Sequence, residues 1–166
     1  MRDSPRIEGC EEASGLRLAI VMSAYHAPVT EGLRDGALAA LARANSEPGR
    51  VVPVITVPGA FELPLAARRA AESGAFDALV CLGCVVRGET PHFDYIASAV
   101  AHGIMSASQE TGVPISFGVL TTNTLEEAQA RAGEGASNKG WEAAMAAVRL
   151  ANTLRALPGG AGGAPA

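Results

Sequence analysis

Aromatic residues and lysine are both scarce in this sequence of 166 residues. Aromatic side chains make up 4% of the chain, and Lys139 is the one lysine among 13 basic residues, the rest being arginine. With 17 acidic residues the formal charge is −4, which gives no broad positive field for nucleic acid or for an anionic membrane surface. We therefore expect neither partner. Because aromatic rings are rare in this chain, several of them in one loop would indicate a function for that loop.

Long apolar runs and a cysteine framework are missing as well. No uninterrupted hydrophobic stretch approaches the ~20 residues that span a membrane. The polar, acidic start, MRDSPRIEGCEEAS, lacks the apolar core of a secretory signal. Three cysteines do not make a disulfide framework in a chain of this length. The expected location is therefore the reducing cytoplasm.

Between its ends the chain alternates short apolar runs with helical patterns. Residues 16–157 are predicted to form one domain. It is flanked by an arm over residues 1–15, disordered or laid on a neighbour, and by a flexible tail over residues 158–166. Apolar runs predict strands at residues 16–23, 51–57, 78–86 and 113–120. Helical spacing predicts helices at residues 30–44, 61–73, 93–111, 124–132 and 137–157.

This alternation predicts an α/β fold, a three-layer αβα sandwich around a four-stranded parallel sheet in flavodoxin-like order. Continuous apolar strands are typical of parallel sheets that are covered on both faces, and strand–helix–strand units are right-handed. Pro53 favours an edge position for the second strand, because proline cannot donate a ladder hydrogen bond. Ligands of such sheets bind beyond the carboxyl ends of the strands, so we expect the chemistry in the turns that follow them.

The turns after the first three strands hold many of the few rings in the chain. They cover residues 23–28, 58–62 and 87–94 and contain two of the three histidines, two of the four phenylalanines and a tyrosine. In a chain so poor in aromatic residues, this concentration predicts a site that binds a flat ring.

The third turn predicts a histidine placed for proton transfer beside a phosphate site. Thr90 and Pro91 are typical of an N-cap followed by the first helical residue, which puts His92 in the first turn of a helix. The positive helix end favours a neutral imidazole, which can act as general acid or base. The backbone N–H groups of Gly88, Glu89 and Thr90 suit a phosphate. A capped turn with a surface histidine is the alternative that these residues alone leave open.

Cys81 and Cys84 have the spacing of a CxxC motif but lie inside a predicted strand. Residues three apart in a strand point to opposite faces, so one metal ion cannot readily bind both thiols. We therefore predict two small buried hydrophobic side chains and no metal. The glycine motifs that bind dinucleotides or the phosphates of nucleotides are absent from the sequence.

Four segments, VPGAFELP, LGCVVRGETPHFDYI, GVLTTNTLEEAQARAG and ASNKGWEAA, together resemble the 6,7-dimethyl-8-ribityllumazine synthases of riboflavin biosynthesis. The resemblance runs in order from about residue 16 to residue 154. It implies a transferase that condenses 5-amino-6-(D-ribitylamino)uracil with 3,4-dihydroxy-2-butanone 4-phosphate and releases the lumazine, phosphate and water, with no cofactor. Family members form pentamers and some build larger shells, so the resemblance also implies a homo-oligomer.

The resemblance gives roles to particular residues. It implies that His92 transfers protons and that Gly88, Glu89 and Thr90 form the turn that receives the butanone phosphate. It assigns the ring and the ribityl chain to Tyr25, Ala60, Phe61, Glu62, Cys84, Val85, Val86 and, near the uracil, Lys139. The implied contributions of an adjacent subunit are Phe117, which covers the ring, and Arg131, which grips the same phosphate. Assembly would then be necessary for activity.

Three positions depart from the commonest pattern of the family. Residues 24–26 read Ala-Tyr-His where many members have an aromatic residue between arginine and asparagine, which affects contacts to the ribityl chain. Glu89 puts a carboxylate beside the expected phosphate, so its side chain must point away. Cys84 replaces a threonine of many members. His92 and Arg131 are retained, so we predict an active enzyme; a non-catalytic flavin-binding or shell-forming homologue is the alternative hypothesis.

Overall fold

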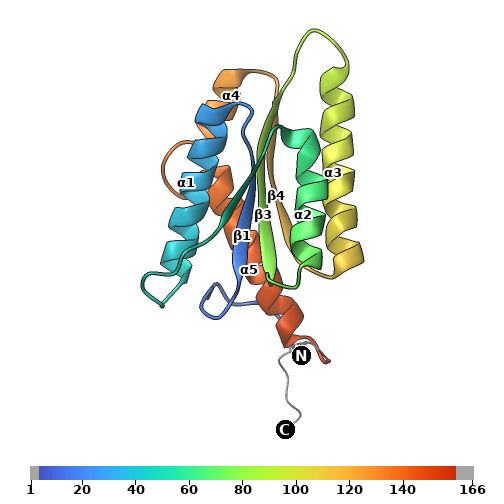
Figure 1. Ribbon diagram of the computed structural model, residues 1–166. Helices are drawn as coiled ribbons and strands as arrows, with labels where there is room; N and C mark the ends of the chain where they lie inside the picture. The colour runs from blue at the N-terminus through green and yellow to red at the C-terminus, as the bar shows by residue number, and fades with distance from the viewer. Residues whose placement is uncertain (1–3, 160–166) are drawn as a thin grey trace.

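The chain alternates strands and helices along its length, as the sequence predicts (Figure 1). The computed structural model describes residues 4–159, so most of the predicted tail lies outside the described residues. The elements in chain order are β1 (Leu18–Ser23), α1 (Ala27–Ala44), β2 (Val54–Val57), the short 3-10 helix η1 (Ala60–Glu62), α2 (Leu63–Glu72), β3 (Ala78–Val86), α3 (His92–Thr111), β4 (Ile115–Thr122), α4 (Leu125–Arg131) and α5 (Lys139–Ala156). None of the helices within residues 4–159 has the length and apolar character that crossing a bilayer requires.

The four strands form one parallel sheet in the order β2-β1-β3-β4, which confirms the predicted sheet and its flavodoxin-like order. The edge position that Pro53 predicts for β2 is also confirmed. The strand is shorter than predicted, because the ladder begins where the Pro53 carbonyl accepts the Ile20 N–H at 2.9 Å. Val51, before the proline, is 85% exposed.

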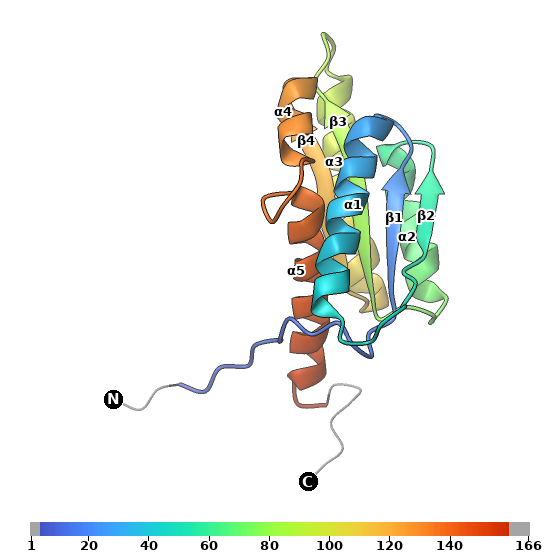
Figure 2. The same cartoon turned by 90° about the vertical axis from the view of Figure 1, so that its left-hand side faces the viewer.

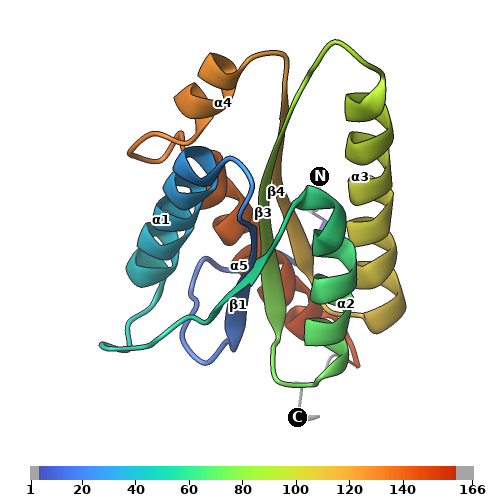
Figure 3. The ribbon, with the colours of Figure 1, turned by 45° about the horizontal axis from the view of Figure 1, so that its top comes forward.

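Helices cover both faces of the sheet, and two separate cores result (Figure 3). The core on one face joins α1, α4 and α5 to side chains such as Ile20 and Leu82. The core on the other face joins α2 and α3 to side chains such as Val21 and Cys81. Neighbouring residues of one strand thus enter different cores, as the two-residue period of a strand requires. This confirms the three-layer sandwich.

The start of α5 is fixed against α1 by a close backbone contact. A Cβ atom at Gly140 would lie 1.9 Å from the Leu33 carbonyl oxygen, so only glycine allows this approach. The buried Asn138 caps α5: its side chain accepts the Gly140 and Trp141 N–H groups and donates to the Gly32 carbonyl at 3.0 Å. These contacts place Lys139, the first residue of α5, beside the first half of α1.

Part of the predicted N-terminal arm crosses the last turns of α5 of its own chain (Figure 2). The Gly9 N–H donates to the Thr153 hydroxyl at 2.9 Å. The Asn152 amide donates to the carbonyls of Cys10 and Glu12 at 3.0 and 2.8 Å. Residues 9–12 are therefore held to the last turns of α5 by hydrogen bonds from two consecutive residues.

Two helix starts differ from the prediction for local reasons. Helix α1 begins three residues early, because His26 takes a left-handed conformation with φ 58° and its carbonyl accepts the Val29 and Thr30 N–H groups. The expectation that Thr90 caps α3 was wrong. Pro91 itself occupies the cap position, and its carbonyl accepts the Asp94 N–H at 3.0 Å with no side-chain cap.

Candidate active site

The turns after β1, β2 and β3 enclose a cavity of about 510 Å³ at the carboxyl edge of the sheet. This is where a parallel sheet of this order places its ligands. The residues that line it are Tyr25, His26, Gly59, Ala60, Phe61, Glu62, Cys84, Val85, Val86, Gly88, Thr90, His92, Phe93 and Ile96. The structure thus brings most of the predicted site residues together, from three turns that are far apart in the sequence.

Two aromatic rings of this cavity are not packed into the core. Tyr25 is 66% exposed and Phe61 is 59% exposed, although both line the cavity. The Tyr25 ring meets the His26 imidazole edge-on, with centroids 4.5 Å apart and an angle of 65° between the planes. Rings that stay uncovered beside a cavity are available to stack on a flat ligand.

The turn between β3 and α3 adds backbone donors and an imidazole to the same cavity. Gly88, Thr90 and His92 line it, and all three are exposed. His92 is the first residue of α3, so N–H groups at the positive end of a 20-residue helix lie beside it. Glu89 is exposed and lies outside the lining. The turn therefore offers unpaired donors, without a lining carboxylate of its own, to an anion.

The floor of the cavity is formed by the buried end of β3. Cys84 packs with the core of α1 and α5, and Cys81 packs with the core of α2 and α3, so the two thiols face opposite sides as predicted. Burial raises the pKa of Cys81 to about 12 and that of Cys84 to about 11. Both thiols are therefore neutral near pH 7. Within residues 4–159 no group of three histidine, cysteine or acidic side chains could hold a metal ion.

Apart from Glu89, the remaining predicted residues line a second cavity of about 400 Å³, against the edge strand β4. Phe117, Arg131 and Lys139 contribute to this lining. Phe117 is 46% exposed. The Arg131 guanidinium donates to the Glu127 carbonyl of its own helix at 2.9 Å, and the Lys139 ammonium lies 2.8 Å from a Glu142 carboxylate oxygen. In one chain, these three residues therefore do not face the cavity that His92 lines.

The whole folded region matches one family of known proteins. Residues 15–155 match the family model described as 6,7-dimethyl-8-ribityllumazine synthase. The chain belongs to this family. It is 50% identical over 150 residues to 6,7-dimethyl-8-ribityllumazine synthase of Syntrophus aciditrophicus (strain SB), an alignment that covers 90% of this chain and 97% of the relative. The lumazine synthase resemblance and the enzyme class that the motifs implied are thereby confirmed.

Some lining residues of this lumazine synthase family member were not among the predicted site residues. They are His26, Gly59, Phe93 and Ile96. His26 and Phe93 could have been found, because each directly follows a predicted site residue in a turn. Gly59 could also have been found, because it directly precedes Ala60 in the turn after β2. Ile96 carries no such signal, because it lies inside α3 and its place depends on how α3 packs against η1 and β3.

Proposed function

We propose that this chain condenses 5-amino-6-(D-ribitylamino)uracil with 3,4-dihydroxy-2-butanone 4-phosphate at sites shared between adjacent subunits of a homo-oligomer, a pentamer or an assembly of pentamers. The products are 6,7-dimethyl-8-ribityllumazine, phosphate and water. The observation that supports this proposal is the division of the site residues between two open cavities, one with His92 and one with Phe117 and Arg131. Placing the second cavity of one subunit against the first cavity of its neighbour joins the two sets.

The first cavity provides the binding surface for the uracil substrate. Tyr25 and Phe61 offer exposed rings to the pyrimidine, and the partner subunit's Phe117 covers the other face. Residues 84–86 give the pocket an apolar floor. Glu62, which is exposed and lines the cavity, can accept hydrogen bonds from the ribityl hydroxyls. The proposal assigns Lys139 of the partner subunit to the rim of the uracil pocket.

The turn at the start of α3 provides the phosphate site. N–H groups of residues 88–90 precede the positive end of the helix, which favours an anion. The partner subunit's Arg131 supplies the positive charge and a planar fork of donors that matches phosphate oxygens. Holding this phosphate fixes the butanone beside the amine of the other substrate. Bringing two reactants together in a productive orientation can supply several kcal/mol of the barrier, up to about 7–11 in favourable cases.

His92 provides proton transfer within this arrangement. The amine of the uracil substrate attacks the ketone carbonyl and water leaves as an imine forms. Elimination of phosphate then leaves an enol, which tautomerises to a new carbonyl and a methyl group. The ribitylamino nitrogen attacks this new carbonyl and closes the ring with loss of a second water. Protons move at nitrogen, carbon and oxygen in these steps. His92 lines the cavity together with the phosphate turn and the ring pocket, so its imidazole can donate or accept them.

A direct assay tests the proposed reaction. Purified protein mixed with both substrates is expected to form the lumazine, followed by its absorbance or fluorescence, faster than the spontaneous condensation. A rate equal to the spontaneous one contradicts the proposal. Tight binding of riboflavin or flavin mononucleotide without condensation would then favour a non-catalytic flavin-binding homologue, the alternative that the altered turn at residues 24–26 suggests.

Subunit mixing tests the shared site separately. When His92→Ala and Arg131→Ala chains are co-expressed in equal amounts, about a quarter of the interfaces in a cyclic assembly pair two intact halves. Activity at low butanone phosphate is therefore expected to exceed that of either parent. Co-expression of His92→Ala with Tyr25→Ala is the matched control, because both residues belong to one half and no interface regains both. Equal recovery in the two mixtures, or a monomer by light scattering, contradicts a shared site.

The same proposal places the enzyme in the cytoplasm, where its three free cysteines stay reduced.

A further inference from the structure

Arg87, the residue that follows β3, ties together three segments at the carboxyl edge of the sheet. Its guanidinium lies 4.3 Å from the centre of the Phe93 ring. Its Nη2 and Nη1 atoms lie 3.1 and 3.4 Å from the two carboxylate oxygens of Asp94, and its Nε donates to the Asn123 side chain at 3.3 Å. The Arg87 backbone N–H donates to the Thr122 carbonyl at 2.8 Å. One side chain thus connects the end of β3, the first turn of α3 and the loop after β4.

These contacts enclose the turn that precedes His92. Residues 88–92 are all exposed, so packing against the core does not hold their conformation. Arg87 stands directly before this stretch, and its two partners in α3, Phe93 and Asp94, stand directly after it. The guanidinium therefore joins both ends of the stretch, and it constrains where α3 begins.

The chemistry of the contact requires arginine rather than any cation. A surface ion pair alone contributes little to stability. Here one planar group both reaches two carboxylate oxygens and stacks on a ring, which the compact ammonium of lysine cannot do at once. Phe93 is 9% exposed, so the ring under the guanidinium is itself anchored in the core. Arg87 does not line the cavity, which means that it acts through the turn and not on the substrate.

We propose that Arg87 is a positioning residue for His92. It holds the turn and the first residue of α3 so that the imidazole is directed at the reacting atoms. The inference rests on the proposed role of His92 in proton transfer. Because small displacements of a catalytic group are costly, loosening this contact is expected to lower kcat by about 10- to 100-fold while the KM for the uracil substrate stays near its original value.

The test uses Arg87→Lys, which keeps the charge and removes the fork and the planar stack. Arg17→Lys is the matched control, because Arg17 also pairs with one aspartate through two nitrogens, at 2.9 and 3.2 Å from Asp77, at the opposite edge of the sheet. We expect Arg87→Lys to lower kcat and Arg17→Lys to leave kcat unchanged. If Arg87→Lys does not fold, Asp94→Asn removes the same ion pair and is expected to lower kcat in the same way.

A double-mutant cycle separates positioning from a general structural effect. In the His92→Ala background, Arg87→Lys is expected to cause no further loss of kcat, since the group that it positions is gone. An equal loss with and without His92, or an unchanged kcat in the single variant, overturns the inference. If His92→Ala alone leaves kcat unchanged, the proposed role of His92 fails first, and the two failures are thereby distinguished.

Discussion

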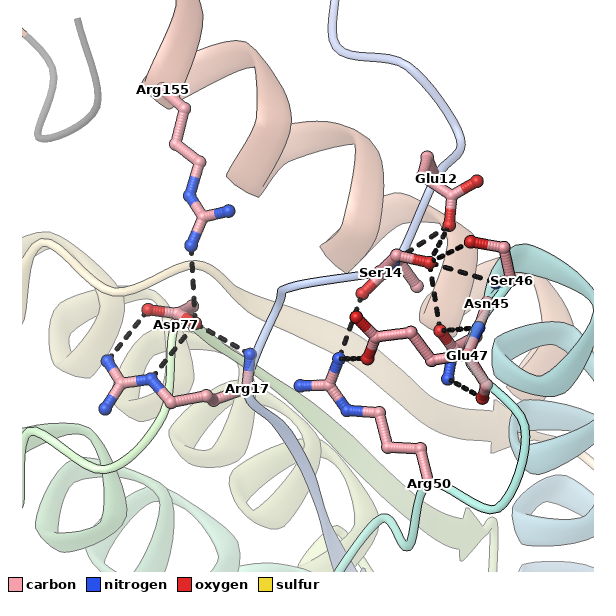
Figure 4. A network of polar contacts seen from close by, with 10 residues as sticks. Glu12, Ser14, Arg17, Asn45, Ser46, Glu47, Arg50, Asp77 and Arg155 are labelled. Carbon is pink, nitrogen blue, oxygen red and sulfur yellow. Dashed lines mark hydrogen bonds and ion pairs between the residues drawn. The ribbon is translucent and has the colours of Figure 1, made fainter. Parts of the chain in front are cut away.

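The two edges of the sheet differ in what their polar and aromatic side chains contact. At the amino edge, charged groups are paired with one another across segments that are distant in the sequence (Figure 4). At the carboxyl edge, Tyr25 and Phe61 are each more than half exposed, and the turn before His92 is exposed as well. The first edge uses its charged side chains to close the fold. The second leaves these rings and this turn uncovered, and its paired cluster, Arg87 with Asp94 and Asn123, stands beside the exposed turn.

Asp77 is the centre of the amino edge. Its carboxylate accepts the Arg17 backbone N–H at 2.7 Å and the Arg17 guanidinium at 2.9 Å, and Arg155 lies 3.4 Å away. Burial alone would raise the pKa of Asp77, but these hydrogen bonds and the two positive charges outweigh it and hold the pKa below its ordinary value. The carboxylate thus links the start of β1, the approach to β3 and the end of α5.

A second part of the same edge fastens the arm to the loop after α1 (Figure 4). The Ser14 hydroxyl contacts Glu12, Asn45 and Ser46. The Asn45 side-chain amide donates to the Glu47 carbonyl and accepts the Glu47 N–H. None of these groups lines either cavity of the site. Substitutions at this edge should therefore change stability, and substitutions at the other edge should change catalysis.

His92→Ala is expected to have the largest effect, and it tests whether a substitution at the carboxyl edge changes catalysis without changing stability. Loss of a general acid or base typically lowers the rate by about 100- to 10,000-fold, and we expect a fall of kcat in this range. Because His92 is exposed and makes no core contact, the melting temperature and the assembly size should stay unchanged. Steady-state assays, thermal melts and light scattering measure the three quantities. An unchanged kcat would remove His92 from proton transfer.

Arg131→Ala tests the same edge from the other half of the site. Among the described residues of its own chain, Arg131 bonds only to the Glu127 carbonyl, so removing it should cost little stability. A charge-assisted contact to phosphate contributes about 1.5–3 kcal/mol, which raises the KM for the butanone phosphate by about 10- to 100-fold with a smaller change in kcat. Arg69→Ala, at an exposed arginine of α2 paired with Glu72, is the control and should leave this KM unchanged.

The sequence predicted the parts of the site that depend on one segment at a time. The apolar run of β3, the proline before β2 and the rings in each turn after a strand are signals that each lie within one short segment. Parallel pairing then brings the strand ends together, so the turns could be grouped without coordinates. The strand period alone predicts that Cys81 and Cys84 point to opposite faces of the sheet, and the structure confirms it.

The parts that the sequence did not predict depend on unusual local backbone conformations or on contacts between distant segments. The left-handed conformation of His26 moves the start of α1, and Pro91 takes the cap position that Thr90 was expected to fill. Both are local, but residue type does not predict them, because His26 takes a positive φ without being glycine and Pro91 caps without a side-chain hydrogen bond. The Asp77 cluster joins residues 17, 77 and 155, a set that no local pattern brings together. Of the fold, therefore, the elements and their order could be predicted, but the network that closes the amino edge could not.

Asp77→Asn is expected to have the smallest effect of the three variants, and the size of that effect depends on pH. After discounting for the exposure of Arg17, the variant should lose about 1–2 kcal/mol of unfolding free energy at pH 7 with an unchanged kcat. Since the folded pKa of Asp77 is lowered, its stabilisation is fully present above the unfolded value of about 3.9 and is lost as the pH falls through the lower folded pKa. The gap between the original protein and Asp77→Asn in urea unfolding should therefore narrow between pH 5 and strongly acidic conditions, and a gap that stays constant would mean that the carboxylate charge does not carry the effect.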